Sequence, residues 1–216
     1  MIGPFGPVGA PASPWRVAGL PAQKMPLSQY DVVNLDGTAV LRVQANASYG
    51  NLVHPLQPPR AGGGTLAWRW RVDRALERAD LRRKQGDDTA AKVCALFDLP
   101  LAQVPFTERM LLRLARQRSG EALPAATVCY VWDATLPPGT QVVNAYSPRL
   151  RYVVLRGGER ELGLWHSERR DIGADFLRLF GDESREVPAL LAVAVGADAD
   201  NTQGQTLAYI ADLQLQ

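Results

Sequence analysis

The sequence predicts an all-β fold, a β-sandwich of jelly-roll type with two short helices in its connections. Three observations predict it: about ten strand-like segments, turn residues between them, and only two segments with helical periodicity. A chain of 216 residues that is 46% hydrophobic suits a single sandwich domain. We expect residues 15–216 to form this domain. Residues 1–14, rich in Pro and Gly, are expected to form a flexible lead-in.

Alternating or continuous apolar residues mark the expected strands along the chain. The predicted strands are 30–35, 38–44, 65–72, 89–97, 127–132, 141–144, 150–156, 161–165 and a C-terminal pair. Asp36-Gly37 is a hairpin-turn dipeptide between the first two strands. The stretch 55–64 is predicted to be a loop because it is rich in Pro and Gly.

Trp68 and Trp70 share one face of the strand 65–72. Two exposed indoles would form a platform for sugar rings, whereas buried ones belong to the core, and we favour the core. The expected core contributors are Trp68, Trp70, Val93, Leu96, Phe97, Val193 and Val195.

The C-terminal pair joins two strands through an acidic, amide-rich turn. Residues 190–197 are a continuous apolar run, typical of a strand buried on both faces. The last strand alternates, with Leu207, Tyr209, Ala211 and Leu213 on one face and Ala208, Ile210 and Asp212 on the other. The chain therefore ends inside a sheet, with carboxylates at one rim.

Two segments have helical spacing. In the predicted helix 105–118, one stripe holds Phe106, Met110 and Leu114, with Leu111 beside it and arginines elsewhere. The predicted helix 171–180 gathers its apolar residues and ends before Gly181.

Composition excludes several classes of function. The net charge is +2, and acids lie among the arginines. The sequence therefore lacks the dense basic stripe that is typical of proteins that bind nucleic acid. No apolar run is long enough to span a membrane. The N-terminus does not resemble a signal peptide, although a mature exported chain with an added Met1 would begin in this way.

Cys94 and Cys129 are too few for a cysteine zinc site or a disulfide framework. Both lie in predicted strands among apolar residues, where inert buried thiols are common. In an exported chain they would pair if their strands were adjacent.

The acidic turn offers oxygen ligands for a structural calcium ion, from Asp198, Asp200 and, in the last strand, Asp212. It is not an EF-hand loop, because Gln203 occupies the place of the sharp-turn glycine. The alternative is a polar turn whose side chains cap their own backbone. We expect no other cofactor.

The loops carry the remaining unusual polar residues. The candidate ligand-binding residues are Arg82, Arg83, Asp87, Asp88, Asn144, Tyr146, Arg170, Asp171 and Asn201. Guanidinium groups suit anionic sugars, and amides suit hydroxyls. Two structural alternatives stay open. Residues 86–88 would be a turn in which one carboxylate pairs with Arg82 or Arg83, and Arg170 and Asp171 would only begin a helix and pair with neighbours.

Several motifs occur in a characteristic order: 68–72 (WRWRV), 86–88 (GDD), 96–98 (LFD), 123–124 (LP), 130–132 (YVW), 170–171 (RD), 175–176 (DF), 180–181 (FG) and 198–202 (DADNT). This series resembles the bacterial domain of unknown function numbered 3047, over most of the chain from Trp68 onward. The resemblance implies export to the periplasm or envelope of Gram-negative bacteria, and no established activity.

We expect a non-catalytic envelope protein that binds a glycan or another polar, anionic ligand. A first alternative is an enzyme acting on envelope polysaccharide with acids such as Asp87, Asp88, Asp98 or Asp175. A second is a structural or assembly partner protein.

Overall fold

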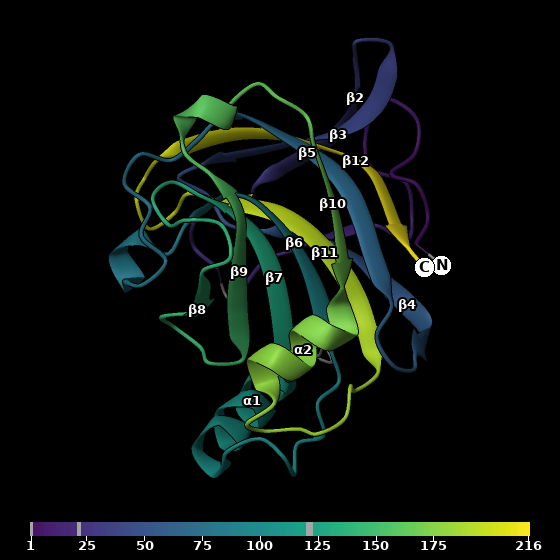
Figure 1. Ribbon diagram of the computed structural model, residues 1–216, viewed down its shortest axis with the longest axis vertical. Coiled ribbons are helices and arrows are strands. Elements are labelled where there is room, and N and C mark those ends of the chain that lie inside the picture. The colour runs from purple at the N-terminus through teal and green to yellow at the C-terminus, as the bar shows by residue number, and fades with distance from the viewer. Residues whose placement is uncertain (1, 21–22, 120–122) are drawn as a thin grey trace.

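Two β-sheets pack face to face in the computed structural model, which describes residues 2–20, 23–119 and 123–216 (Figure 1). The seven-stranded sheet has the order β1 (Arg16–Ala18), β4 (Asn51–Arg60), β11 (Leu190–Asp198), β6 (Thr89–Phe97), β7 (Ala126–Asp133), β9 (Leu150–Gly157) and β8 (Gln141–Val143). The five-stranded sheet has the order β10 (His166–Asp171), β5 (Thr65–Arg74), β12 (Gln205–Leu215), β3 (Thr38–Asn46) and β2 (Gln29–Leu35). The predicted jelly-roll sandwich is confirmed.

The two α-helices also lie where the sequence predicts them, at α1 (Phe106–Ser119) and α2 (Ile172–Phe180). Short 3-10 turns occupy η1 (Lys84–Gly86) and η2 (Glu159–Glu161). The carboxylate of Asp171 caps α2 by accepting hydrogen bonds from the amides of Gly173 and Ala174. Phe176 and Phe180 of this helix are fully buried, so α2 closes one end of the core (Figure 1).

Interlocking aromatic rings fill the space between the sheets. The ring centroid of Trp68 lies 5.6 Å from that of Trp70 and 5.3 Å from that of Tyr130. Trp70 in turn contacts Trp132 at 6.0 Å. Trp68 and Trp70 are at most 2% exposed, so they are core residues and not a sugar platform. The other expected core residues are also buried, apart from Leu96, which is half-buried on the opposite face of β6.

Two strand predictions are wrong for physical reasons. Residues 55–60 of the expected loop belong to β4. A strand can contain Pro58 and Pro59 because they lie where the β4–β11 register shifts, so the sheet needs no hydrogen bond from a backbone amide at these positions. The expected strand 161–165 is η2 and a turn, and the strand begins at His166. This edge strand, β10, is wholly polar and therefore lacks the apolar alternation that marks the others.

A β-bulge near the end of β12 changes the predicted facing of its residues. Asp212 has a positive φ of 53°, and the register with β5 shifts between Ala211 and Gln214. Ala211 is therefore buried, while Leu207 and Tyr209 are half-exposed on the outer face. Asp212 is exposed and does not share a buried face with Ile210.

The segment before Trp15 contacts both sheets. The amide of Gly3 donates to Nε2 of His54, and Gly9 pairs with Val32 through two backbone hydrogen bonds. The expected flexibility of residues 1–14 stays a prediction. Among the described residues, no helix has the length and apolar character needed to cross a bilayer.

Candidate functional site

The outer face of the seven-stranded sheet, away from the other sheet, is unusually apolar. Side chains alternate along a strand, so the continuous apolar runs of β6, β7 and β11 supply apolar residues to both faces. Members of this second apolar cluster include Val53, Cys94, Cys129, Val131, Ala192 and Ala194. An antiparallel sheet usually presents polar residues on a face that no other layer covers.

A disulfide on this face joins β6, the central strand of the sheet, to its neighbour β7. Cys94 of β6 and Cys129 of β7 lie directly opposite each other in the ladder and are bonded. Of the two alternatives for these residues, pairing is therefore the correct one. The bond closes a loop with a sequence separation of 35 residues.

A groove of about 680 Å³ runs over this face. Its apolar lining includes Val53, Leu96, Leu123, Leu150, Leu191, Ala192 and the disulfide. Its polar lining is Arg16, Tyr49, Asn51, Gln57, Lys92 and Thr127. Leu96, which the sequence predicts to be a core residue, therefore lines the groove and does not lie between the sheets. Both charged residues in the lining are cations.

Lys92 forms a buried ion pair at the polar end of the groove. Its Nζ lies 2.7 Å from Oδ2 of Asp198, and each side chain is only 4% exposed. The ring of Tyr49 covers the ammonium group at 5.1 Å. Burial alone lowers the pKa of Lys92, but Asp198 and Tyr49 outweigh it and raise that pKa. Sequence reasoning missed Lys92, although a single lysine within the apolar run of β6 was the available signal.

Asp87 lies beside this pair at the start of β6. Its carboxylate accepts hydrogen bonds from the amide of Asn144 and from the hydroxyl of Tyr152, which lies 3.2 Å away. Burial, reinforced by the negative charge of Asp198, raises the pKa of Asp87 to about 6. Tyr152 is a second residue that sequence reasoning did not identify.

Asp88 holds the acidic turn against the sheet. It accepts hydrogen bonds from the backbone amides of Asn201 at 3.1 Å and Thr202 at 2.6 Å, and from the Thr202 hydroxyl. Asp200 is half-buried, and its buried Oδ1 has no hydrogen-bond partner within the described part of the chain. Burial, Asp198 and Asp88 together raise the pKa of Asp200 to about 6.

The calcium hypothesis receives no added support. In residues 2–20, 23–119 and 123–216, no three His, Cys, Asp or Glu side chains are grouped to hold a metal ion. Asp198 and Asp200 lie with Asp87 and Asp88 at the start of β6 and the end of β11, a group that we call the acidic rim. Asp212 lies elsewhere and pairs with Arg69 at 2.6 Å. Calcium binding therefore stays a prediction, which the effect of a chelator on Tm would test.

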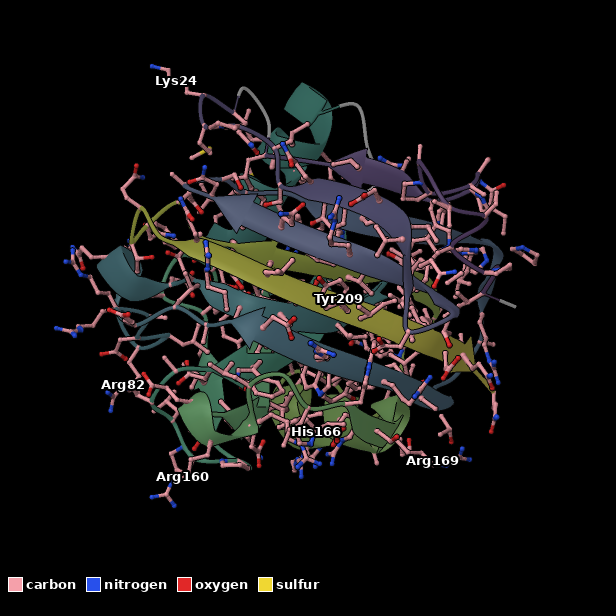
Figure 2. The ribbon with its side chains drawn as sticks, turned by 90° about the horizontal axis from the view of Figure 1, so that it is seen from above. Lys24, Arg82, Arg160, His166, Arg169 and Tyr209 are labelled. Atoms are coloured by element: carbon pink, nitrogen blue, oxygen red, sulfur yellow. A yellow bond between two sulfur atoms is a disulfide. The ribbon has the colours of Figure 1, made fainter. Side chains whose placement is uncertain are left out.

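The expected ligand-binding residues fall in four segments, 82–88, 144–146, 170–171 and the turn at Asn201, and all but 170–171 meet at this rim. The hydroxyl of Tyr146 lies 2.7 Å from Oδ1 of Asn201 and 3.1 Å from the carbonyl of Lys84. Arg82 and Arg83 both pair with Asp80 at 2.9 Å, and their side chains are 63% and 74% exposed. Arg82 points away from the molecule at its edge (Figure 2).

The fourth segment lies apart from the rim. Arg170 pairs with Asp175 at 2.8 Å, and Asp171 caps α2, as the structural alternative proposed. The acids of the enzyme hypothesis are also dispersed. Asp98 follows the end of β6 that is opposite Asp87, which precedes the first residue of the strand. Asp175 is engaged by Arg170, Arg178 and the hydroxyl of Tyr130.

The chain is thus a jelly-roll β-sandwich protein with an apolar groove on its larger sheet. A model of the family described as "Protein of unknown function (DUF3047)" matches residues 13–214, and the chain belongs to this family. No curated protein sequence matches it.

Several solved structures are similar to this chain at low identity. The family 12 xyloglucanase from Bacillus licheniformis is 10% identical, with a TM-score of 0.48 over 88% of each chain. Endoglucanase cel12A from Rhodothermus marinus is 13% identical, with a TM-score of 0.47 over 94% of this chain and 95% of its own. Endoglucanase 3 from Trichoderma harzianum is 8% identical, with a TM-score of 0.46 over 95% of this chain and 99% of its own. At such identities and TM-scores, nothing about ligand or activity is carried over.

Proposed function

We propose that this protein is a non-catalytic binding module that holds its ligand in the groove on the outer face of the seven-stranded sheet. The observation that carries the proposal is the groove itself, an apolar space of about 680 Å³. Ligand sites typically have volumes of about 300–1,000 Å³ and a mostly apolar lining with a few polar groups.

The lining favours a ligand with an apolar body and one polar end. Leu96, Leu150 and Leu191 offer aliphatic contact along the groove. Tyr49 and Asn51 can hydrogen-bond a polar end group near Lys92. Because Asp198 already neutralises Lys92, the polar groups left for a ligand there are the neutral side chains of Tyr49 and Asn51, which suit a hydroxyl-bearing end.

The disulfide supports an exported location for this module. Disulfides form and persist in oxidising compartments such as the bacterial periplasm, and are rare in the cytosol. The Cys94–Cys129 bond is therefore consistent with the expected periplasmic or envelope site.

Glycan binding at the acidic rim is a second candidate. Tyr146 is 57% exposed beside Asn201, with the ammonium of Lys84 5.3 Å from its ring centroid, so a sugar would find an aromatic side chain and polar groups to contact. The carbohydrate-active enzyme is less well supported, because its candidate acids do not face one another across a cleft.

Binding of the fluorescent apolar anion 1-anilinonaphthalene-8-sulfonate tests the main proposal. Thr127 is half-buried in the groove lining between Leu96 and Leu150, so Thr127→Phe should obstruct the site and weaken binding about tenfold. Ala67→Phe is the matched control, because Ala67 is half-exposed on the outer face of the five-stranded sheet.

If both variants bind the probe as the wild type does, the groove is not the site. The glycan candidate has a separate test in a glycan array. Tyr146→Ala should abolish any glycan signal while probe binding in the groove stays unchanged. Loss of glycan signal in Thr127→Phe alone would contradict the rim as the glycan site.

A further inference from the structure

The groove on the outer face of the seven-stranded sheet has an almost wholly aliphatic apolar lining. Leucine, valine, alanine and proline side chains form it together with the disulfide. Among the described lining residues, Tyr49 alone carries an aromatic ring. Aromatic ligands gain from stacking on aromatic side chains, whereas a saturated hydrocarbon needs only apolar surface that water leaves. The chemistry of the lining therefore favours a saturated hydrocarbon.

Alanines of β11 form the floor of the groove. In the ladder, Ala194 lies between Val53 of β4 and Cys94 of β6. Ala192, two residues earlier on the same face, is also flanked by longer side chains of these two strands. Because a methyl side chain is shorter than its neighbours, the surface is hollowed along β11.

The groove is extended and thin. Lining residues of β4 run from Asn51 to Gln57, a distance of about 20 Å along the strand. The groove volume of about 680 Å³ therefore gives a mean cross-section of about 34 Å² over that length. A thin space over a twisted sheet suits a flexible chain, which can follow the surface, better than a rigid fused-ring body.

One end of the groove is polar and electrically balanced. Nζ of Lys92 lies 2.7 Å from Oδ2 of Asp198, so the ammonium charge is already neutralised. The amide of Asn51 donates to the hydroxyl of Tyr49 at 3.2 Å, and both side chains are half-buried. Tyr49 can still donate its proton and Asn51 can still accept at Oδ1, which is the pair of bonds that one hydroxyl group needs.

We propose that the groove binds the alkyl or acyl chain of a single-chain lipid whose end group is uncharged and carries a hydroxyl. This inference rests on the proposed function, because it names the ligand class of the same groove. The chain would lie on the alanine floor between β4 and β6, and the hydroxyl would contact Tyr49 and Asn51. A fatty carboxylate is a poorer ligand, because the cation beside these two residues is already paired.

Titration of the isotope-labelled protein with alkan-1-ols, followed by amide NMR shifts, tests this inference. Octan-1-ol, decan-1-ol and dodecan-1-ol share a hydroxyl end and differ only in chain length, and each is used below its solubility limit. Their shifts should centre on Cys94, Ala192 and Ala194. The affinity should rise about fourfold for each added methylene group, because each one buries more hydrocarbon.

Two variants test the two ends of the groove. Tyr49→Phe removes the hydroxyl and keeps the ring, so every alkanol should bind about fivefold more weakly while the gain per methylene group stays the same. Tyr209→Phe, the same change on the outer face of the other sheet, is the control and should bind as the wild type does. Thr127→Phe adds a ring opposite Leu96, so it should weaken binding of dodecan-1-ol more than that of octan-1-ol.

The outcomes separate this inference from the proposed function. If 1-anilinonaphthalene-8-sulfonate binds in the groove and no alkanol does, the inference is overturned and the groove remains a ligand site. An affinity that does not rise with chain length, or alkanol shifts centred between the sheets around Trp68 and Trp70, also overturns it. Wild-type binding by Tyr49→Phe overturns the assigned hydroxyl end. If neither probe shifts the amides of the groove, the inference and the proposed function both fail.

Discussion

The two sheets present very different outer faces to their surroundings. On the five-stranded sheet, charged side chains form exposed or half-exposed pairs: Arg42 with Asp31 at 2.7 Å, and Arg71 with Asp73 at 2.6 Å. Figure 2 looks onto this face, where Tyr209 lies near the middle of β12 among polar side chains. This is the usual outer face of an antiparallel sheet.

The seven-stranded sheet keeps apolar residues and a disulfide on the corresponding face, and its ion pair is buried. Lys92 and Asp198 are each 4% exposed, whereas Arg69 and Asp212 on the other sheet are 38% and 55% exposed. Burying a charge pair and leaving a groove unfilled both cost stability. The outer face of the seven-stranded sheet therefore has features that cost stability, as expected of a face that serves to bind a ligand.

Removing one cation from each face should give the largest contrast. Lys92→Met leaves the buried carboxylate of Asp198 without its cation and should lower the free energy of unfolding by about 3–5 kcal/mol. Arg69→Met, in an exposed pair, should lower it by at most about 1 kcal/mol. Urea unfolding monitored by tryptophan fluorescence measures both.

A second variant separates loss of the charge from loss of packing. Lys92→Met combined with Asp198→Asn should be more stable than Lys92→Met alone, because no unpaired charge remains. Equal losses for Lys92→Met and Arg69→Met would show that the two faces do not differ as described.

Removing the disulfide should have the next largest effect. Cys94→Ala with Cys129→Ala opens a loop with a sequence separation of 35 residues and should lower the free energy of unfolding by about 3–4 kcal/mol. Urea unfolding of the oxidised wild type and the double variant measures the difference. An unchanged midpoint would mean that the bond does not form in the folded protein.

Strands β5 and β4 show where sequence reasoning succeeded and where it failed. The alternation of Leu66, Trp68 and Trp70 located β5 and its buried face, because one side chain in two must enter the core. The prolines concealed β4, because a register shift allows strand residues without ladder amides.

The groove was not predictable from periodicity. A continuous apolar run such as β11 shows that both faces are apolar, but not whether another layer covers the second face. The exposed stripe of α1 had the same ambiguity, since spacing identifies an apolar side and not its environment. The rim residues Asp87 and Asn201 are polar loop residues that the antiparallel β6–β11 pairing brings together, and Asn144 joins them through its hydrogen bond to Asp87.

The smallest effect concerns pH and the acidic rim. The pKa of Asp200 is raised from the ordinary 3.8 to about 6, so the native state holds this proton more tightly than the unfolded chain. Stability from this group is therefore present below about pH 4 and lost as the pH rises through 6. Asp200→Asn should raise Tm slightly at pH 7.5, by less than about 3 °C because the side chain is only half-buried, and should not at pH 4.

Asp212→Asn removes the same charge on the five-stranded face and serves as the control. Because Asp212 is exposed and pairs with Arg69, this change should not raise Tm at pH 7.5. A lower Tm for Asp200→Asn at pH 7.5 would contradict the assigned direction of the pKa shift.

Titration of the isotope-labelled protein with 1-anilinonaphthalene-8-sulfonate, followed by amide NMR shifts, tests the central claim most directly. Ligand in the groove should shift the amides of the central strands around Cys94, Cys129 and Ala194, with little change around Tyr209 on the other sheet. Shifts confined to the five-stranded face, or to the rim around Tyr146 and Asn201, would show that the apolar outer face of the seven-stranded sheet is not the binding site.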